Sequence, residues 1–535
     1  MSAQSVLPDL SALVARAAAQ RPDAVALVAG DRRLTWAEVE DQVARVATGI
    51  GEAGVVAGQR VLLALGNRVE FVTSYLGTLR AQAVSVPVNP TSTEGELARM
   101  IADSGARLAV GDGATLGVVR EAVSLVNRAR GGEPGVLDPD LVLRAVATRV
   151  VALDGAPADG ELGFEQLLAV PPRDVPPLPD PEKLAALLYT SGTSGRPRAA
   201  MLTHRALLAN VEQVTVVEPP MMRADDVVLG VLPMFHVYGL NAVLGGVARH
   251  GCRLVIAERF EPEATLDLVA AEGCTVVPIA PPVFAYWKGV PGLRERLGTV
   301  RLILSGSAPL AASVIEEFGA ATGIAVHQGY GLTEAAPVVT STLCSENLQH
   351  GSVGAALPGI ELRLVDDRGH PPEGEDPGEI QVKGANLFSG YWPDGAGGPD
   401  GDGWWSTGDV GFLDGSGDLF LVDRIKELVI VSGFNVYPIE VEDVIREVDG
   451  VEDVAVIGTE DEQTGEAVVA YVRAPDADAV AVEAAVRARC EERLAGFKRP
   501  SRVEIVDELP LTVTGKVQKG RLRGLERRRS LGLLE

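Results

Sequence analysis

Apolar residues along the chain follow two alternating patterns: short continuous runs, and longer segments in which they recur every three or four positions. In the N-terminal part the runs lie at residues 60–65, 83–88 and 106–110, and the longer segments lie at 69–81 and 93–105. Strands that alternate with helices of this length are typical of parallel βαβ units. The pattern therefore predicts a layered α/β unit in this part of the chain.

A second series with the same alternation begins near residue 227. Its predicted strands lie at 227–233, 252–257, 274–279, 300–306 and 324–331, and its predicted helices at 239–249 and 262–273. Residues 131–181, between the two series, are rich in proline and glycine and show little periodicity, so we expect a surface excursion there. The N-terminal part is thus predicted to hold two parallel α/β units.

The pattern changes twice in the C-terminal part. After about residue 351, short strand-like runs joined by turn residues predict a β-rich subdomain. From residue 423 the pattern predicts a compact α+β domain, with strands at 428–431, 453–458, 467–472 and 502–506 and helices at 438–450 and 480–494. We therefore divide the chain into a large domain, residues 1–423, and a small domain, residues 424–535, each of a size that can form its own core.

Length and composition limit the class of protein. A chain of 535 residues is too long for one core, and 46% hydrophobic with 23% charged residues is typical of a soluble globular protein. The formal net charge of −25 argues against nucleic-acid binding. No apolar run approaches the roughly 18 residues of a membrane helix, no secretory signal is visible, and the four cysteines show no CxxC spacing. We therefore expect a cytoplasmic protein without a transmembrane segment; the composition says nothing about its oligomeric state.

Residues 189–199 (YTSGTSGRPRA) combine glycines, small hydroxyl residues and two arginines directly after a predicted buried strand at 184–188. Glycines let several backbone N–H groups converge on one anion, hydroxyls add donors, and an arginine binds phosphate oxygens. The stretch lacks the GKS/T ending of a Walker loop. From these residues alone, a phosphate-binding loop and an ordinary surface loop both remain open.

Three further residues each have a chemical and a structural explanation. Glu334, after a glycine-rich turn, is either a magnesium ligand or an acid in the first turn of a helix. Asp409 either accepts hydrogen bonds from ribose hydroxyls or caps its own turn. His236, among apolar and aromatic neighbours, is either a site residue or a core histidine.

Taken together, six stretches resemble the acyl-adenylate-forming (AMP-dependent) synthetase superfamily, and among its members fatty acyl-CoA ligases most. In family order they are residues 189–198 (YTSGTSGRPR), 235–239 (FHVYG), 329–334 (GYGLTE), 406–409 (STGD), 423–442 (DRIKELVIVSGFNVYPIEVE) and 514–519 (TGKVQK). The resemblance covers nearly the whole chain. It implies that ATP and a carboxylate form an acyl-AMP with Mg²⁺ as cofactor, and that coenzyme A then takes the acyl group.

The resemblance also assigns roles to residues. For ATP and AMP it implies Thr190, Ser191, Gly192, Thr193, Ser194, Gly195, Arg198, Ala308, Gln328, Gly329, Tyr330, Thr333, Asp409, Arg424 and Lys516. The catalytic set is Lys516, Glu334, His236 and Arg424, and the metal would lie near Glu334 and Thr193. For the acyl group it implies an apolar crevice near His236, Val237, Tyr238, Gly239, Gly306 and Val338.

In the family the small domain rotates between the two half-reactions. Lys426 matches the hinge position, within residues 423–426, and Ser432 and Gly433 match the strip beside the CoA tunnel. The chain departs from the family pattern at Arg198 and Ala199, where most members have lysine and glycine. The arginine keeps the charge, but its planar fork is not equivalent to an ammonium group.

The motifs define the acid substrate and the acyl acceptor less closely than they define the nucleotide site. We expect a fatty or similar apolar acid, with aromatic acids open, because His236 stands where amino-acid-activating members carry an aspartate. Alternative functions are an acyl-AMP ligase that loads a carrier protein and a catalytically silent nucleotide-binding scaffold. Retention of Lys516, Glu334, Asp409 and Arg424 argues against the scaffold.

Overall fold

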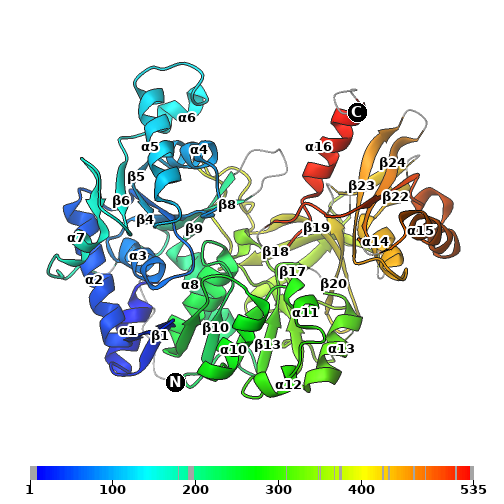
Figure 1. Cartoon of the computed structure of the whole chain (residues 1–535), viewed down its shortest axis with the longest axis horizontal. Helices are drawn as coiled ribbons and strands as arrows, with labels where there is room; N and C mark the ends of the chain where they lie inside the picture. The colour runs from blue at the N-terminus through cyan, green and yellow to red at the C-terminus, as the bar shows by residue number, and fades with distance from the viewer. Residues whose placement is uncertain are drawn as a thin grey trace.

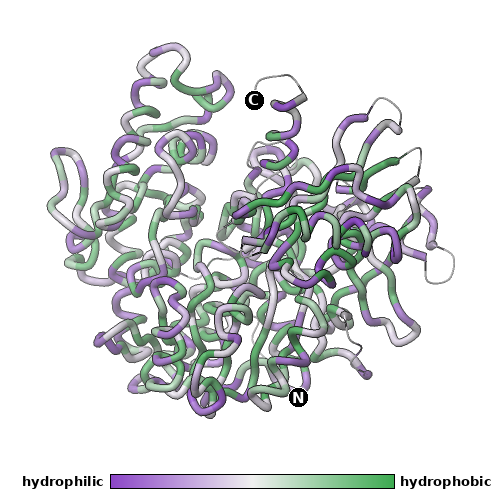
Figure 2. Tube along the Cα trace, turned by 45° about the vertical axis from the view of Figure 1, so that its right-hand side comes forward, coloured by the Kyte–Doolittle hydropathy of each residue, from purple (hydrophilic) through white to green (hydrophobic). Residues whose placement is uncertain are grey.

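The computed structural model describes residues 9–176, 178, 180–190, 198–308, 310–347, 349, 351–366, 368–372, 376–424, 427–431, 434–461, 464–475, 477–512 and 515–530. Within them, two large α/β layers, a β-rich region and a small α+β region follow one another along the chain (Figure 1). This order confirms the predicted fold class. Apolar positions run mainly through the inner elements, and polar ones collect on outer loops and helix faces (Figure 2).

The first predicted series forms a seven-stranded sheet in the order β7-β6-β5-β3-β4-β8-β9. Its strands are parallel except for β9, which returns antiparallel along β8. The strands are β3 (Arg60–Ala64), β4 (Val84–Pro87), β5 (Ala106–Gly111), β6 (Arg149–Ala152), β7 (Leu162–Gly163), β8 (Leu184–Thr190) and β9 (Arg198–Thr203). The helices of this part are α2 (Trp36–Glu52), α3 (Val69–Arg80), α4 (Glu94–Ser104), α5 (Leu116–Arg130), α6 (Pro139–Arg144) and α7 (Phe164–Leu168).

The second series forms another seven-stranded sheet, in the order β14-β13-β12-β10-β11-β1-β2. The strands are β1 (Val25–Ala29), β2 (Arg32–Thr35), β10 (Val227–Gly230), β11 (Arg253–Ile256), β12 (Val276–Ile279), β13 (Leu302–Ser305) and β14 (Val326–Gln328). The helices are α1 (Ala12–Gln20), α8 (His204–Thr215), η1 (Tyr238–Gly245), α9 (Gly246–His250), α10 (Pro262–Glu272), α11 (Pro282–Trp287), α12 (Leu293–Arg296) and α13 (Ala312–Thr322). β1 precedes the first sheet in the chain but pairs in parallel with β11 of the second, so the two sheets interlock.

Two expectations need correction. Residues 131–181 are not only a surface excursion, because β6 and β7 extend the first sheet and α6 and α7 flank them. These strands are too short, and too close to proline and glycine, for periodicity to reveal them. The helix expected at 239–249 is divided into the π-helical η1 and the α-helical α9.

The C-terminal part follows the predicted order of elements. The β-rich region holds β15 (Thr340–Ser341), β16 (Ala355–Ala356), β17 (Ile360–Val365), β18 (Gly378–Gly384), β19 (Trp405–Leu413) and β20 (Leu419–Arg424). The small region holds β21 (Val429–Val431), β22 (Phe434–Val436), α14 (Pro438–Arg446), β23 (Asp453–Asp461), β24 (Gly465–Arg473), α15 (Ala479–Arg493), η3 (Gly496–Lys498), β25 (Arg502–Val506) and α16 (Lys519–Ser530). The described apolar residues from Val429 onward cluster among themselves, apart from those of the large sheets.

Asn67 joins the two large sheets. It lies just after β3 in the first sheet, yet its Nδ2 donates to the carbonyls of Gly230 at 3.3 Å, Leu232 at 3.0 Å and Ala257 at 3.3 Å, around the carboxyl ends of β10 and β11. Its Oδ1 accepts from the N–H of Met234 at 2.8 Å. The side chain is buried, so these backbone groups have little access to water as a substitute partner.

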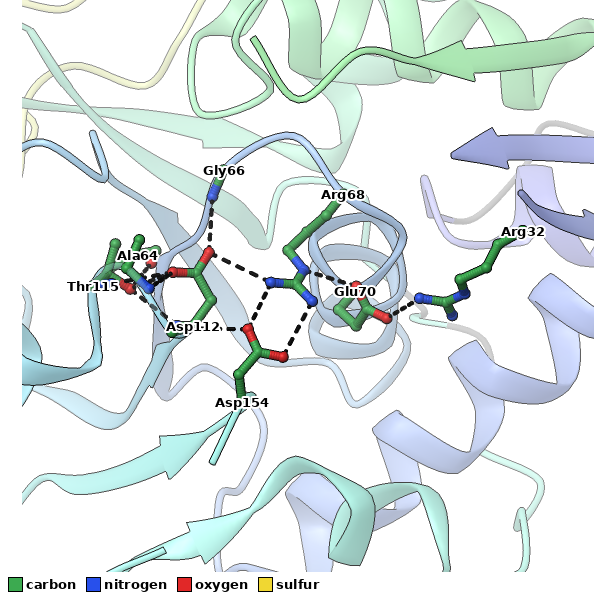
Figure 3. Close-up of polar contacts among 10 residues, drawn as sticks. Arg32, Ala64, Gly66, Arg68, Glu70, Asp112, Thr115 and Asp154 are labelled. Carbon is green, nitrogen blue, oxygen red and sulfur yellow. Dashed lines mark hydrogen bonds and ion pairs between the residues drawn. The ribbon is translucent and has the colours of Figure 1, made fainter. Parts of the chain in front are cut away.

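An ion-pair network runs beside this contact (Figure 3). Arg32 of β2 pairs with Glu70 of α3 at 2.6 Å, which connects the second sheet to a helix of the first. Arg68 pairs with the same Glu70 at 2.8 Å and with Asp154, beyond β6, at 2.9 Å. Asp112 lies 3.7 Å from Arg68. Although burial opposes it, hydrogen bonds from Arg32 and Arg68 lower the pKa of Glu70, so the carboxylate stays charged.

We expect Asn67→Ala to lower the free energy of unfolding by about 3 kcal/mol, because it leaves buried carbonyls and an N–H without partners. Denaturant unfolding followed by circular dichroism measures the loss. Asn127→Ala, on the exposed side of α5, is the matched control and should change stability by less than about 0.5 kcal/mol. Equal effects of the two substitutions would show that Asn67 does not hold the sheets together.

Candidate active site

A cavity of about 1350 Å³ lies where the carboxyl ends of both large sheets meet the β-rich region and the loop that carries Lys516. Parallel α/β sheets present ligand sites at this edge because successive strand-to-helix loops converge there. The cavity has an arm lined by polar residues from β14, η2 (Thr333–Ala335) and β19, and an apolar arm beside η1. Lys516 and His236 are both in its lining.

The polar arm is organised around Tyr330 and Asp409. The Tyr330 hydroxyl donates to Asp409 Oδ2 at 2.6 Å, and both side chains are buried. Gly329 comes directly before the tyrosine. A Cβ on Gly329 would lie 2.6 Å from the carbonyl oxygen of Thr340, so only glycine fits there. The backbone of Asp409 pairs with that of Arg424 across β19 and β20.

Glu334 lies in the one-turn helix η2, and its side chain is buried at the cavity wall. The Tyr391 hydroxyl donates to its Oε1 at 2.7 Å. An oxygen ligand of this kind suits Mg²⁺, which often takes one or two protein carboxylates and completes its shell with phosphates and water. Among the described residues no cluster of three or more His, Cys, Asp or Glu could hold a metal alone, so substrate oxygens would have to supply part of the shell.

The apolar arm is lined by Val214, Met221, Met222, Phe235, Val237, Tyr238, Ala242, Val243, Gly306 and Val338. Gly306 is required by a close approach, because a Cβ there would lie 2.8 Å from Tyr238 Cε1. Ser305, at the end of β13, adds a buried hydroxyl with no hydrogen-bond partner among the described residues. Most of these side chains belong to one buried apolar cluster or pack against it.

His236 lies between the two arms and contributes an uncharged ring. Burial, and then the charge of Lys516, lower its pKa to about 4. Its Nδ1 is buried and has no protein partner within the described part of the chain. An imidazole that stays neutral near pH 7 can face both an apolar acid and a lysine without charge repulsion.

Lys516 reaches the cavity from a tight turn. The Thr512 N–H donates to the Lys516 carbonyl at 2.7 Å, and the Lys516 N–H donates back to Thr512 Oγ1 at 3.0 Å. Gly515 has φ of +79°, and a Cβ there would lie 2.4 Å from Cγ of Pro282 in α11. The turn therefore packs directly against the second large sheet's layer.

The structure brings most predicted site residues to one cavity. Those in its lining are Thr190, Arg198, His236, Val237, Tyr238, Gly306, Gln328, Gly329, Tyr330, Thr333, Glu334, Val338, Asp409 and Lys516. Ala308 and Gly239 are described but do not belong to the lining. Gly239 packs against the backbone of Pro233, because a Cβ on it would lie 2.4 Å from the Pro233 carbonyl oxygen. Ser191, Gly192, Thr193, Ser194, Gly195, Lys426, Ser432 and Gly433 lie outside the described residues, as does the side chain of Arg424. The catalytic and binding roles of all these residues remain predictions.

Sequence reasoning missed Tyr391, Val214 and the two methionines. Tyr391 follows a glycine in a loop with no helical or strand period, so no local signal marked it. Met221 and Met222 come from the segment between α8 and β10, which the hydrophobic pattern leaves unassigned.

Comparison with known proteins identifies the family. The profile of the AMP-binding enzyme family matches residues 14–392, and that of the AMP-binding enzyme C-terminal domain matches residues 440–516. The chain belongs to the AMP-binding enzyme family. It is accordingly an AMP-forming acid–thiol ligase, the class that its motifs predict.

Relatives in this family include 4-coumarate–CoA ligase 3 of Oryza sativa subsp. japonica, which is 34% identical over 91% of this chain and 86% of its own length. The ATP-bound structure of MatB from Rhodopseudomonas palustris superposes with a TM-score of 0.84 at 31% identity, over 97% of this chain and 99% of that one. A Mycobacterium tuberculosis fatty acyl CoA synthetase superposes with a TM-score of 0.73 at 29% identity, over 97% and 98%. In the described part of this chain, no helix is long and apolar enough to cross a membrane.

The lowered pKa of His236 predicts an acid-sensitive contribution to stability. The unfolded histidine binds a proton near pH 6.5 and the folded one near 4, so stability falls as pH drops from about 6.5 to 4. Between pH 6.5 and 4, the free energy of unfolding of His236→Gln should fall by about 3 kcal/mol less than that of the wild type. Denaturant unfolding at each pH measures this difference. His370→Gln, at an exposed position, is the control. If the free energy of unfolding of His236→Gln falls with pH as steeply as that of the wild type, the assignment is wrong.

Proposed function

We propose that this ligase activates an apolar, ring-bearing carboxylic acid with ATP and transfers the acyl group to coenzyme A. In the first step an acid oxygen bonds to the α-phosphorus, and the bond to the β-phosphate breaks, releasing pyrophosphate. In the second, the CoA sulfur bonds to the acyl carbon, AMP leaves, and the thiol proton passes to solvent. One observation carries the proposal: a clustered set of apolar lining residues shares one cavity with Lys516, Tyr330 and Asp409.

The residues of the cavity suit the first step. Asp409, fixed by Tyr330, can accept hydrogen bonds from ribose hydroxyls, and Lys516 can neutralise charge between the carboxylate and the α-phosphate. When two anions must meet, catalysis depends on positioning and charge neutralisation. A magnesium ion held by Glu334 would neutralise phosphate charge.

The shape of the apolar arm supports a compact acid. Beyond Val214 and Met222, the next cavity, which shares these two residues and Ala242, has a volume of only about 10 Å³. A Cβ on Gly246 in that wall would lie 2.7 Å from Met222 Sδ, so the methionine is tightly packed. The name of the rice relative, a 4-coumarate–CoA ligase, agrees with such an acid.

A fatty acid is the second candidate. The likeness to the Mycobacterium tuberculosis fatty acyl CoA synthetase favours it, and methionine side chains at the end of the arm can change rotamer to admit a longer chain. Transfer to a carrier protein in place of coenzyme A also stays an alternative.

We further propose that residues 424–535 form a separate small domain that turns about residues 423–426 between the two steps, with Lys426 at the hinge. The separate apolar clusters beyond Val429 support this division. In that case Lys516 leaves the cavity once acyl-AMP has formed.

ATP–pyrophosphate exchange with a panel of acids tests the function. We expect cinnamate- and benzoate-type acids to react at least about tenfold faster than amino acids or dicarboxylic acids, because a second charge would be buried in the apolar arm. Thioester should form only when coenzyme A is added. Preference for palmitate would favour the second candidate, and preference for charged acids would overturn both.

Lys516→Ala tests the role of the lysine. Its side chain is exposed on the small region, so folding should be intact, whereas adenylation should fall by roughly 10²–10³. The variant should still convert synthetic acyl-AMP and coenzyme A to thioester. Lys288→Ala, which removes an exposed ion pair with Glu317, is the control. Equal loss of both half-reactions in a folded variant would contradict the assignment.

A further inference from the structure

Arg198, at the position where most family members have lysine, stacks on an aromatic ring. Its Cζ lies 3.9 Å from the centroid of the Tyr391 ring. Gly397 lies beside both groups, because a Cβ on it would stand 3.3 Å from Tyr391 Cδ2 and 3.6 Å from Arg198 Nη2. A planar guanidinium can lie flat over a ring, which a compact ammonium group does not match in shape.

Neighbouring residues hold both the backbone and the ring of Tyr391 in place. Its N–H donates to the Ala396 carbonyl at 3.0 Å, and its backbone forms a bridge with Ala200 in β9. Phe388 packs edge-on against the ring, with centroids 5.0 Å apart. Since both the backbone and the ring face are fixed, the hydroxyl has a defined place, 2.7 Å from Glu334 Oε1.

The hydroxyl orients the carboxylate without neutralising it. A lysine or arginine at this place would bind Glu334 more strongly but would cancel the charge that a cation needs. A phenol leaves the full negative charge on the carboxylate. The guanidinium over the ring draws electron density from it, which makes the phenol a better hydrogen-bond donor.

We propose that Arg198 and Tyr391 are positioning residues for Glu334, and that Arg198 acts on the ATP site through the tyrosine. The proposal rests on the proposed function, because it assumes that Glu334 serves magnesium-dependent ATP binding. It assigns a use to the arginine that departs from the family pattern and to a tyrosine that the motifs did not include.

Tyr391→Phe removes only the hydroxyl and tests the first half of the proposal. We expect ATP binding measured by calorimetry to weaken about fivefold to tenfold with Mg²⁺ present and to be unchanged with EDTA. In turnover, the KM for ATP should rise while that for the acid stays constant. Tyr286→Phe, at an exposed tyrosine of α11, is the matched control. Wild-type magnesium-dependent binding by Tyr391→Phe would overturn the role of the hydroxyl.

A double-mutant cycle tests whether Arg198 acts through Tyr391. Arg198→Ala alone should weaken magnesium-dependent ATP binding about threefold to tenfold, and it should add less than about twofold in the Tyr391→Phe background. Fully additive effects would show that Arg198 contacts phosphate directly and would overturn this half of the proposal. If the proposed function itself fails, the wild-type protein will form no acyl-AMP, whereas failure of the positioning proposal leaves the wild type active.

Discussion

The four hydrogen bonds of Asn67 define the constraint on which the site depends. One buried amide satisfies carbonyls at the ends of two strands of the second sheet while its own backbone belongs to the first. Its fourth bond fixes Met234, two residues before His236. Because a buried polar group without a partner is costly, the two sheets can hardly shift without breaking this set. The position of His236 thus depends on the contact between the sheets as well as on its own loop, where its N–H donates to the Pro233 carbonyl at 3.1 Å.

The cavity meets a problem of like charge by combining charged and neutral groups. Glu334 and Asp409 are buried carboxylates beside the place proposed for a triphosphate, and each accepts a hydrogen bond from a tyrosine hydroxyl. A phenol orders a carboxylate and leaves its charge available. In the proposed function, Glu334 would face a metal ion and Asp409 the ribose hydroxyls, and Lys516 and that metal ion would supply the balancing positive charge.

The sequence predicted the two α/β layers, the β-rich region and the order of the small region well, because long strands and amphipathic helices have strong periods. It failed for β6 and β7, which are short and surrounded by glycine and proline, and for the pairing of β1 with β11, which depends on contacts distant in the chain. The site motifs named most of the lining residues. They could not name Tyr391, Val214 or Met222, because these residues reach the cavity through tertiary packing.

The turn that carries Lys516 is attached to the small region, as the proposed rotation between the two steps requires. Thr512 and Lys516 are joined by two hydrogen bonds, from the Thr512 N–H to the Lys516 carbonyl and from the Lys516 N–H to Thr512 Oγ1. Lys519, three residues later, pairs with the buried Glu442 of α14 at 2.8 Å and with Glu427 at 3.3 Å, which ties the turn to the small region. Gly515 of the same turn lies close to α11, because a Cβ on it would stand 2.4 Å from Cγ of Pro282. If the small region turns as proposed, its ion pairs through Lys519 would carry the lysine with it, whereas Asn67, Glu334 and Asp409 come from other parts of the fold.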